Sequence, residues 1–309
     1  MKGLSVNLRS SYFKMLAHVG AIVTMGAWGT SFLATKVLMI EGGFTPIEMF
    51  IYRFACAYLL ILLITFKKIF AHNWKDELQL CICGMCAGTI YYVTENYALQ
   101  NTTTGNVSLL ASISPLFTTA LMAIIYKARI TAGNIIGSIV AFAGVACIIF
   151  SNGEGFEINP KGDLLAICAS LSWAVYTIAV KRLNPIYSSL FITRKLFFYG
   201  VLTALPLLIA QDAPLHIGLL FNPEFPQFFF SFMFLVIMCS VVGYLIWSEV
   251  MKVLGPVTAN NYIYMQPLVT MVAAYFVLDE QIFLFGYIGC ALIIGGLILA
   301  DKLKIGHSD

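Results

Sequence analysis

Charge is scarce in this 309-residue sequence: 11% of the residues are Asp, Glu, Lys or Arg, whereas 60% are apolar. A soluble domain typically has about 25% charged and about 45–50% apolar residues. Together with a mean hydropathy of +0.88, this composition excludes an ordinary soluble globular protein. The formal net charge is +3, and the basic residues fall in small clusters, so we expect no nucleic-acid partner. The lipid bilayer is the expected solvent of this chain.

Motifs of nucleotide-dependent and metal-dependent enzymes are also missing. The sequence has no HExxH, P-loop, GxSxG or dinucleotide-binding glycine motif, and its four histidines are scattered. Cys81, Cys83 and Cys86 lie close together, but no histidine is near them, and a structural zinc site needs four nitrogen or sulfur ligands. We therefore predict neither a metal nor a cofactor, and we interpret the cysteines as small apolar residues.

Long apolar runs, by contrast, are abundant. A helix that spans a bilayer needs about 20 mostly apolar residues. Runs of this kind cover residues 15–37, 47–66, 78–98, 106–126, 131–150, 163–181, 189–210, 228–251, 257–278 and 284–301. The sequence therefore predicts an all-α integral membrane protein with ten transmembrane helices.

The orientation of these helices follows from the basic residues, because cytoplasmic loops retain Lys and Arg. A cytoplasmic N-terminus puts most of the basic residues on the inner side: Lys67, Lys68, Lys75, Lys127, Arg129, Lys181, Arg182, Lys252, Lys302 and Lys304. The outer loops contain Lys161 but collect the acidic Glu154, Glu157 and Asp163. We expect both termini, residues 1–14 and 302–309, to be cytoplasmic.

Comparison of the sequence with itself indicates an internal repeat. The segment WGTSFLATK at 28–36 returns as WAVYTIAVK at 173–181, and the FIYR that ends at Arg53 returns as the FITR that ends at Arg194. Further pairs follow in the same order: Glu95 with Glu249, Pro115 with Pro267, and Gly137 and Gly144 with Gly289 and Gly296.

Each predicted half, residues 15–150 and 163–301, has five helices. Because five is an odd number, the second half enters the membrane in the opposite orientation, which makes the repeat inverted. Transporters use such a pseudo-two-fold arrangement to hold a midplane site between two halves that rock. A duplication that merely builds a larger bundle is the alternative interpretation.

These features resemble the EamA-type members of the drug/metabolite transporter superfamily. The duplicated ten-span unit, the early Trp and Lys of each half, Pro115 and Pro267, and the glycine-spaced last helices carry the resemblance over nearly the whole chain. It implies a carrier of the bacterial inner membrane that often exports amino acids or other small metabolites. One departure is evident: the acidic residue that the family tends to have before the last helix of each half is Glu280 in the second half, whereas Ala128 and Arg129 replace it in the first.

Charged residues inside the predicted spans are candidates for gating and coupling, because each costs roughly 2.5–3.5 kcal/mol at mid-helix on insertion scales. The candidates are Lys36, Arg53 and Glu95 toward the outer side and Lys181, Arg194 and Glu249 toward the inner side. We hypothesise that Arg53 with Glu95, and Arg194 with Glu249, form ion pairs that close alternately. The alternative is that the arginines snorkel to lipid headgroups and the glutamates simply lie near helix ends.

The residues near two prolines are candidates for substrate binding. Pro115 and Pro267 are expected to kink their helices and to free a carbonyl, which survives in a membrane only inside protein or beside a wet cavity. Polar side chains lie around them, and Trp28 and Trp173 occur mid-span, away from the interface where tryptophan is enriched. The candidate substrate-binding residues are Trp28, Tyr91, Ser112, Trp173, Tyr244, Asn260, Tyr264 and Gln266. Hydrogen bonding between helices and plain packing are the alternative explanations.

The favoured interpretation is a secondary carrier for a small molecule, not an enzyme, that works by alternating access as a monomer or a homodimer. Protons are a candidate coupling ion, since Glu95 or Glu249 could carry one. The alternative is an integral-membrane enzyme that acts on a lipid-linked substrate, with His72 and Glu77 as base and acid in the loop after the second span. A channel is disfavoured, because no ring of like charges or carbonyls is evident.

Overall fold

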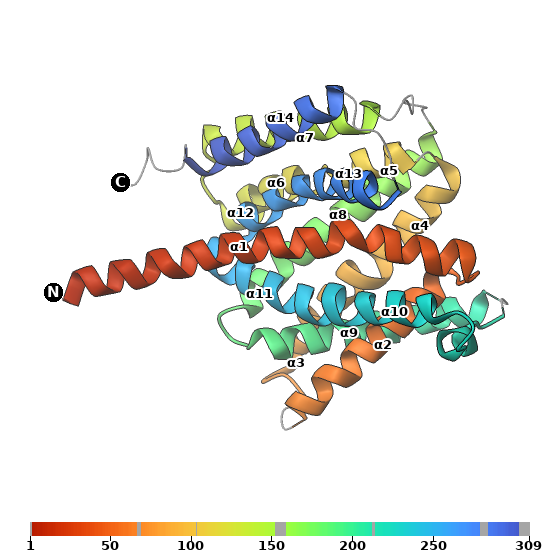
Figure 1. The fold of residues 1–309 in the computed structure, drawn as a ribbon. Coiled ribbons are helices and arrows are strands. Elements are labelled where there is room, and N and C mark those ends of the chain that lie inside the picture. Colours follow the sequence, from red (N-terminus) through yellow and green to blue (C-terminus); the bar gives the residue numbers. More distant parts are fainter. Residues whose placement is uncertain are drawn as a thin grey trace.

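The computed structural model describes residues 2–66, 69–102, 104–151, 159–211, 214–278 and 284–302 (Figure 1). All regular structure in these ranges is helical. The first stretch contains α1 (Lys2–Lys36), η1 (Val37–Glu41), α2 (Pro46–Thr65), α3 (Trp74–Gly84), η2 (Met85–Ile90), α4 (Tyr91–Asn101), α5 (Thr104–Ala111), α6 (Ser114–Tyr126) and α7 (Ala132–Ser151). The second contains α8 (Pro160–Leu183), α9 (Ser189–Ala210), η3 (Ile217–Phe221), α10 (Pro226–Phe234), η4 (Leu235–Val242), α11 (Gly243–Leu254), α12 (Pro256–Asn261), η5 (Tyr262–Tyr264), α13 (Met265–Leu278) and α14 (Leu284–Lys302).

Within the described ranges, eight helical stretches are long and apolar enough to cross a membrane. They coincide with the predicted spans except for 78–98 and 257–278. There the chain is helical but changes its winding: the π-helical η2 separates α3 from α4, and the 3₁₀ turn η5 separates α12 from α13. The prediction of an all-α, multi-pass membrane protein is thus confirmed at this level.

The two prolines lie in the first turn of a helix instead of within a kinked one. Pro115 is the second residue of α6, which begins after α5 has ended at Ala111. Pro267 is the third residue of α13, directly after η5. Proline has no N–H to donate, and the first turn of a helix is where that donor is not needed. A restart of the helix therefore replaces the predicted kink at both positions.

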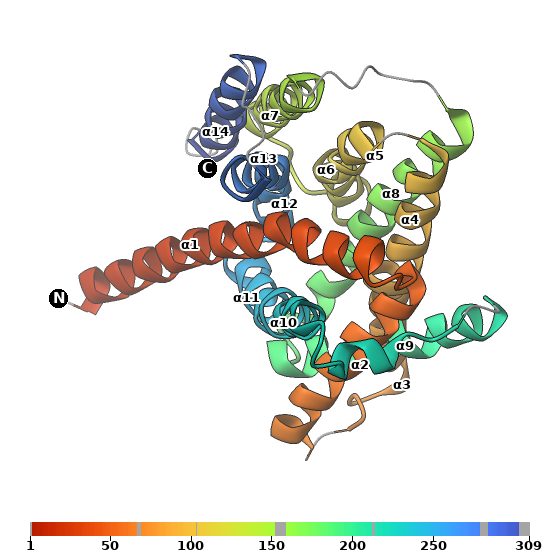
Figure 2. The same ribbon diagram turned by 45° about the vertical axis from the view of Figure 1, so that its right-hand side comes forward.

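α7 and α14 lie side by side in both views of the ribbon (Figures 1 and 2). A Cβ atom added at Gly137 would lie 2.5 Å from the carbonyl oxygen of Gly296, and one added at Gly144 would lie 2.7 Å from that of Gly289. The lower number on one helix meets the higher number on the other, so the helices are antiparallel. Small residues allow the backbones of membrane helices to approach this closely.

Two helices occupy the middle of the bundle. α1 packs against α11 and α13, and α8 packs against α4, α5 and α6. Their tryptophans meet: the rings of Trp28 and Trp173 have centroids 5.6 Å apart in an edge-to-face arrangement. The first turn of α1 and the last turn of α14 lie at the same end of the molecule (Figure 1).

Candidate functional site

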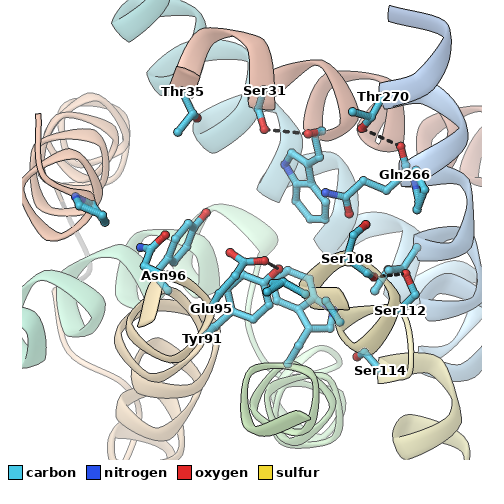
Figure 3. Close-up of a pocket in the computed structure, with 18 of the residues that line it drawn as sticks. Ser31, Thr35, Tyr91, Glu95, Asn96, Ser108, Ser112, Ser114, Gln266 and Thr270 are labelled. Carbon is cyan, nitrogen blue, oxygen red and sulfur yellow. Dashed lines mark hydrogen bonds between the residues drawn. The ribbon is translucent and has the colours of Figure 1, made fainter. Parts of the chain in front are cut away.

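A cavity of about 440 Å³ lies between helices of both halves of the chain, and Figure 3 draws the labelled side chains around it. Its aromatic lining residues are Trp28, Phe50, Tyr91, Tyr92, Trp173 and Tyr244. Its polar lining residues are Ser31, Thr35, Arg53, Glu95, Asn96, Ser108, Ser112, Ser114, Gln266 and Thr270. Mostly apolar walls with a few polar groups, in a volume of roughly 300–1,000 Å³, are typical of sites for small organic molecules.

The two central tryptophans are held by hydrogen bonds to other helices. Trp28 Nε1 donates to the carbonyl oxygen of Cys239 at 2.8 Å, and Trp173 Nε1 donates to Asn260 Oδ1 at 3.1 Å. Since each indole nitrogen is satisfied, both rings are fixed and present their apolar faces to their neighbours. Tyr244 extends this aromatic wall, with its ring centroid 5.4 Å from that of Trp28.

Arg53 and Glu95 both line the cavity, but they do not pair with one another. The Nε of Arg53 donates to Ser240 Oγ, and its guanidinium lies 6.0 Å from the centre of the Tyr92 ring. Glu95 Oε1 accepts a hydrogen bond of 2.8 Å from the hydroxyl of Tyr91. The ion pairs between described residues are Glu77 with Lys195, Glu48 with His216, and Glu249 with Lys252. The hypothesised outer pair is therefore absent from this structure.

The hypothesised inner pair is absent as well, because both of its members have other partners. Arg194 donates to the carbonyl oxygens of Thr65 and Ile69, which follow the last turn of α2. Glu249, an exposed residue, accepts from Ser189 Oγ and from Lys252 Nζ, the latter at 3.4 Å.

The two lysines grouped with these residues do not extend the cavity. Lys181 Nζ lies 3.9 Å from the centre of the Tyr126 ring, and the cavity lining does not include it. Lys36 is the last residue of α1, but its side chain lies outside the described residues.

Six of the eight candidate substrate-binding residues line the cavity: Trp28, Tyr91, Ser112, Trp173, Tyr244 and Gln266. Asn260 and Tyr264 do not, and both are fully buried. The side-chain nitrogen of Asn260 donates to Ser114 Oγ at 3.3 Å and to Thr118 Oγ1. Asn260 therefore holds α6, α8 and α12 together instead of facing a ligand.

Several polar lining residues were not singled out from the sequence. Ser31 lies one turn after Trp28, and Thr270 lies one turn after Gln266. Residues three or four apart share one face of a helix, so this spacing could have identified both. Asn96 directly follows Glu95 and carries no such signal.

His72 and Glu77, the candidate enzyme residues, lie in separate interactions. The carboxylate of Glu77 accepts from Lys195 Nζ, from the Tyr199 hydroxyl and from the backbone N–H of Ala71, the last at 2.7 Å. Burial tends to raise the pKa of Glu77, but these hydrogen bonds and the charge of Lys195 hold it below its usual value. The ring of His72 stacks on that of Tyr187, with centroids 4.9 Å apart.

Comparison with known proteins defines the class to which this fold and cavity belong. The model of the EamA-like transporter family matches residues 15–150 and 160–300. The chain belongs to the EamA-like transporter family, which confirms the resemblance drawn from the sequence. It is accordingly a multi-pass membrane protein of a transporter family.

Individual relatives are distant but nearly full in length. An uncharacterized transporter of Archaeoglobus fulgidus is 27% identical over 91% of this chain and 96% of its own. A probable terminal-alkyne amino-acid exporter of Streptantibioticus cattleyicolor is 28% identical over 75% of this chain and 76% of its own. A crystal structure with 19% identity superimposes with a TM-score of 0.75 over 95% of this chain and 99% of that one, so the two share a fold.

Proposed function

We propose that this protein is a secondary transporter that moves small metabolites, amino acids or related compounds, out across the bacterial inner membrane by alternating access. The cavity carries this proposal, because both family-matched stretches contribute to it. Trp28 and Glu95 come from the first stretch, and Trp173 and Gln266 come from the second. A relative named as a probable amino-acid exporter supports both the substrate class and the direction.

The proposed topology has ten membrane-crossing segments, with the interrupted helices at 74–101 and 256–278 completing the eight apolar ones. The antiparallel contact of α7 with α14 supports two inverted five-helix repeats, residues 15–150 and 163–301. A second pair of matching contacts supports it too. Trp28 of α1 donates to the carbonyl of Cys239 in η4, and Ser172 of α8 donates to that of Cys86 in η2 at 2.7 Å. In this topology the termini, 1–14 and 302–309, are cytoplasmic.

The cavity in this topology opens outward. Its lining includes Thr35 in the last turn of α1 and Pro46 at the start of α2, both of which face the outer side. At the opposite end, His18 Nδ1 and the Tyr262 hydroxyl are 2.6 Å apart and join α1 to η5. An alternating pair of Arg194 with Glu249 should be closed in such an outward-open state, so its absence removes that pair from the mechanism proposed here.

The interactions of Glu77 favour the carrier over the lipid-linked enzyme. Its carboxylate is an acceptor for Lys195 and Tyr199, which ties α3 to α9. We expect His72→Ala to leave transport unchanged. Protons remain the proposed coupling ion, with Glu95 as the carboxylate that faces the cavity. Equal flux with and without an imposed pH gradient would remove proton coupling.

The test of the proposed function is counterflow into liposomes that contain the purified protein, screened against amino acids, nucleobases and amphipathic amines. Ala111 lines the cavity, so Ala111→Trp fills it and is expected to abolish flux. Ala120→Trp, on the exposed face of α6, is the matched control and is expected to retain it. Absence of flux for every compound, or equal flux in wild type and Ala111→Trp, contradicts the proposal.

A further inference from the structure

Arg53 is a buried cation whose charge faces the cavity without a protein anion. Its residue is 8% exposed, and its Nε is used by Ser240. Within the part of the chain that the structure describes, the two terminal nitrogens of the guanidinium have no hydrogen-bond partner. Removing a charge from water is costly unless the charge is paired, so this side chain is built to receive an anion from outside the protein.

Glu95 presents the complementary charge to the same cavity. One carboxylate oxygen accepts from Tyr91, and the other accepts no hydrogen bond from any described residue. Figure 3 shows Glu95 beside Tyr91 among the labelled side chains around the cavity. A carboxylate with one free oxygen in a mostly apolar cavity favours a cationic partner.

The two charges are held by neighbouring residues of one helical turn. Arg53 lies over the ring of Tyr92, and Glu95 is bonded to Tyr91, the preceding residue of α4. Their nitrogen and oxygen atoms are nevertheless more than 4.0 Å apart, since no salt bridge between these two described residues exists. A ligand that carries both charges on adjacent atoms can bridge this gap, whereas direct pairing cannot occur without movement.

We infer that the transported molecule is a zwitterionic α-amino acid, with its carboxylate bound by the guanidinium of Arg53 and its ammonium bound by Glu95 and Tyr91. Trp28 and Trp173 border the same space, so they pack against an apolar or aromatic side chain of the substrate. A guanidinium can bind a carboxylate through two parallel hydrogen bonds, which adds geometric selectivity. This inference rests on the proposed transport function and names the groups that select the substrate.

A molecule with a single charge leaves the other cavity charge unpaired. We therefore expect binding to weaken by roughly tenfold to a hundredfold when either head group is blocked, as for other buried hydrogen bonds to charged groups. The probes are L-phenylalanine, L-leucine and L-threonine, their methyl esters, which lack the carboxylate, and their N-acetyl derivatives, which lack the ammonium. Each derivative competes against counterflow of the labelled free amino acid.

Four variants assign the two subsites. Arg53→Gln should remove the preference for the free acid over the methyl ester, and Arg53→Lys should keep part of it. Glu95→Gln should remove the preference for the free amine over the N-acetyl derivative and leave the preference against the ester. Arg129→Gln and Glu224→Gln make the same charge changes at exposed loop positions and should keep both preferences. Thermal unfolding of every variant identifies any that is misfolded, and Arg53→Lys then carries the test.

The outcomes separate the two proposals. Derivatives that compete as strongly as the free amino acids, or variants that weaken all probes equally, overturn the zwitterion site. Flux of nucleobases or amines without flux of any amino acid also overturns it, while the carrier stands. No flux of any compound overturns the proposed transport function itself.

Discussion

The two family-matched stretches carry the same residue types at matching positions, yet only some of these residues have matching surroundings. The glycines are equivalent, since Gly137 and Gly144 of α7 meet Gly296 and Gly289 of α14 reciprocally.

The arginines are not equivalent. Arg53 is directed to the cavity and a hydroxyl, whereas Arg194 binds backbone carbonyls beyond the end of α2. The comparison teaches that repeated residues keep their roles where both copies face each other. They diverge where one side of the bundle is open and the other is closed.

The glycine contact between α7 and α14 is the place to test equivalence, and it should give the largest effects. Gly137→Ala would place a Cβ 2.5 Å from the Gly296 oxygen, and Gly289→Ala would place one 2.6 Å from the Gly144 oxygen. Both atoms belong to backbone that cannot yield without separating the helices, so we expect each variant to lose about 2–5 kcal/mol of stability. Thermal unfolding in detergent measures the loss.

Gly295→Ala is the matched control for these variants, because no atom lies within 4 Å of its added Cβ. It should unfold at the wild-type temperature or slightly above it. A large loss in one of the first two variants and none in the other would break the equivalence of the two helices.

The arginines should separate stability from selectivity. Arg194→Gln removes donors from the carbonyls of Thr65 and Ile69, and we expect a loss of about 1.5–3 kcal/mol in the free energy of unfolding. Its preference between a free amino acid and the methyl ester should be unchanged. Arg53→Gln should show the opposite pattern in the same two measurements. If Arg194→Gln altered the ester preference, Arg194 would belong to the substrate path and the contrast would fail.

The tryptophans should behave alike, with smaller effects. Trp28→Phe and Trp173→Phe each remove one indole N–H, the first from the Cys239 carbonyl and the second from the Asn260 side chain. A hydrogen bond of this kind contributes about 1 kcal/mol, so both variants should be destabilised by a similar amount in thermal unfolding. Loss in only one of them would show that the copies diverge at the cavity wall as well.

The positions of the helices could be predicted from the sequence because hydropathy and spacing depend on the bilayer alone. The aromatic wall could also be predicted, since Trp28 and Trp173 occur far from the interface where tryptophan is enriched. The family match follows from the same landmarks. These properties are local to each segment, so a single sequence carries them.

The surroundings of individual polar residues could not be predicted. Asn260 and Gln266 look alike in the sequence, but the 3₁₀ turn η5 between them changes the winding of the chain, and only Gln266 lines the cavity. The partner of Arg53 is Ser240 of η4, distant in the sequence and marked by no motif. Such contacts depend on how the helices pack, which periodicity does not specify.

Glu249 gives the smallest expected effect and the sharpest test of the asymmetry. Its side chain is 61% exposed, and its pairing with Lys252 is an ion pair within one helical turn, of the kind that contributes about 0–1 kcal/mol. Glu249→Gln should therefore change the unfolding free energy and the transport rate little, in contrast to Glu95→Gln. Counterflow and thermal unfolding of both variants, beside Glu224→Gln, measure the difference. If Glu249→Gln stopped transport at unchanged stability, Glu249 would be needed in the inward-open state, and the asymmetry would belong to one conformation and not to the two copies of the repeat.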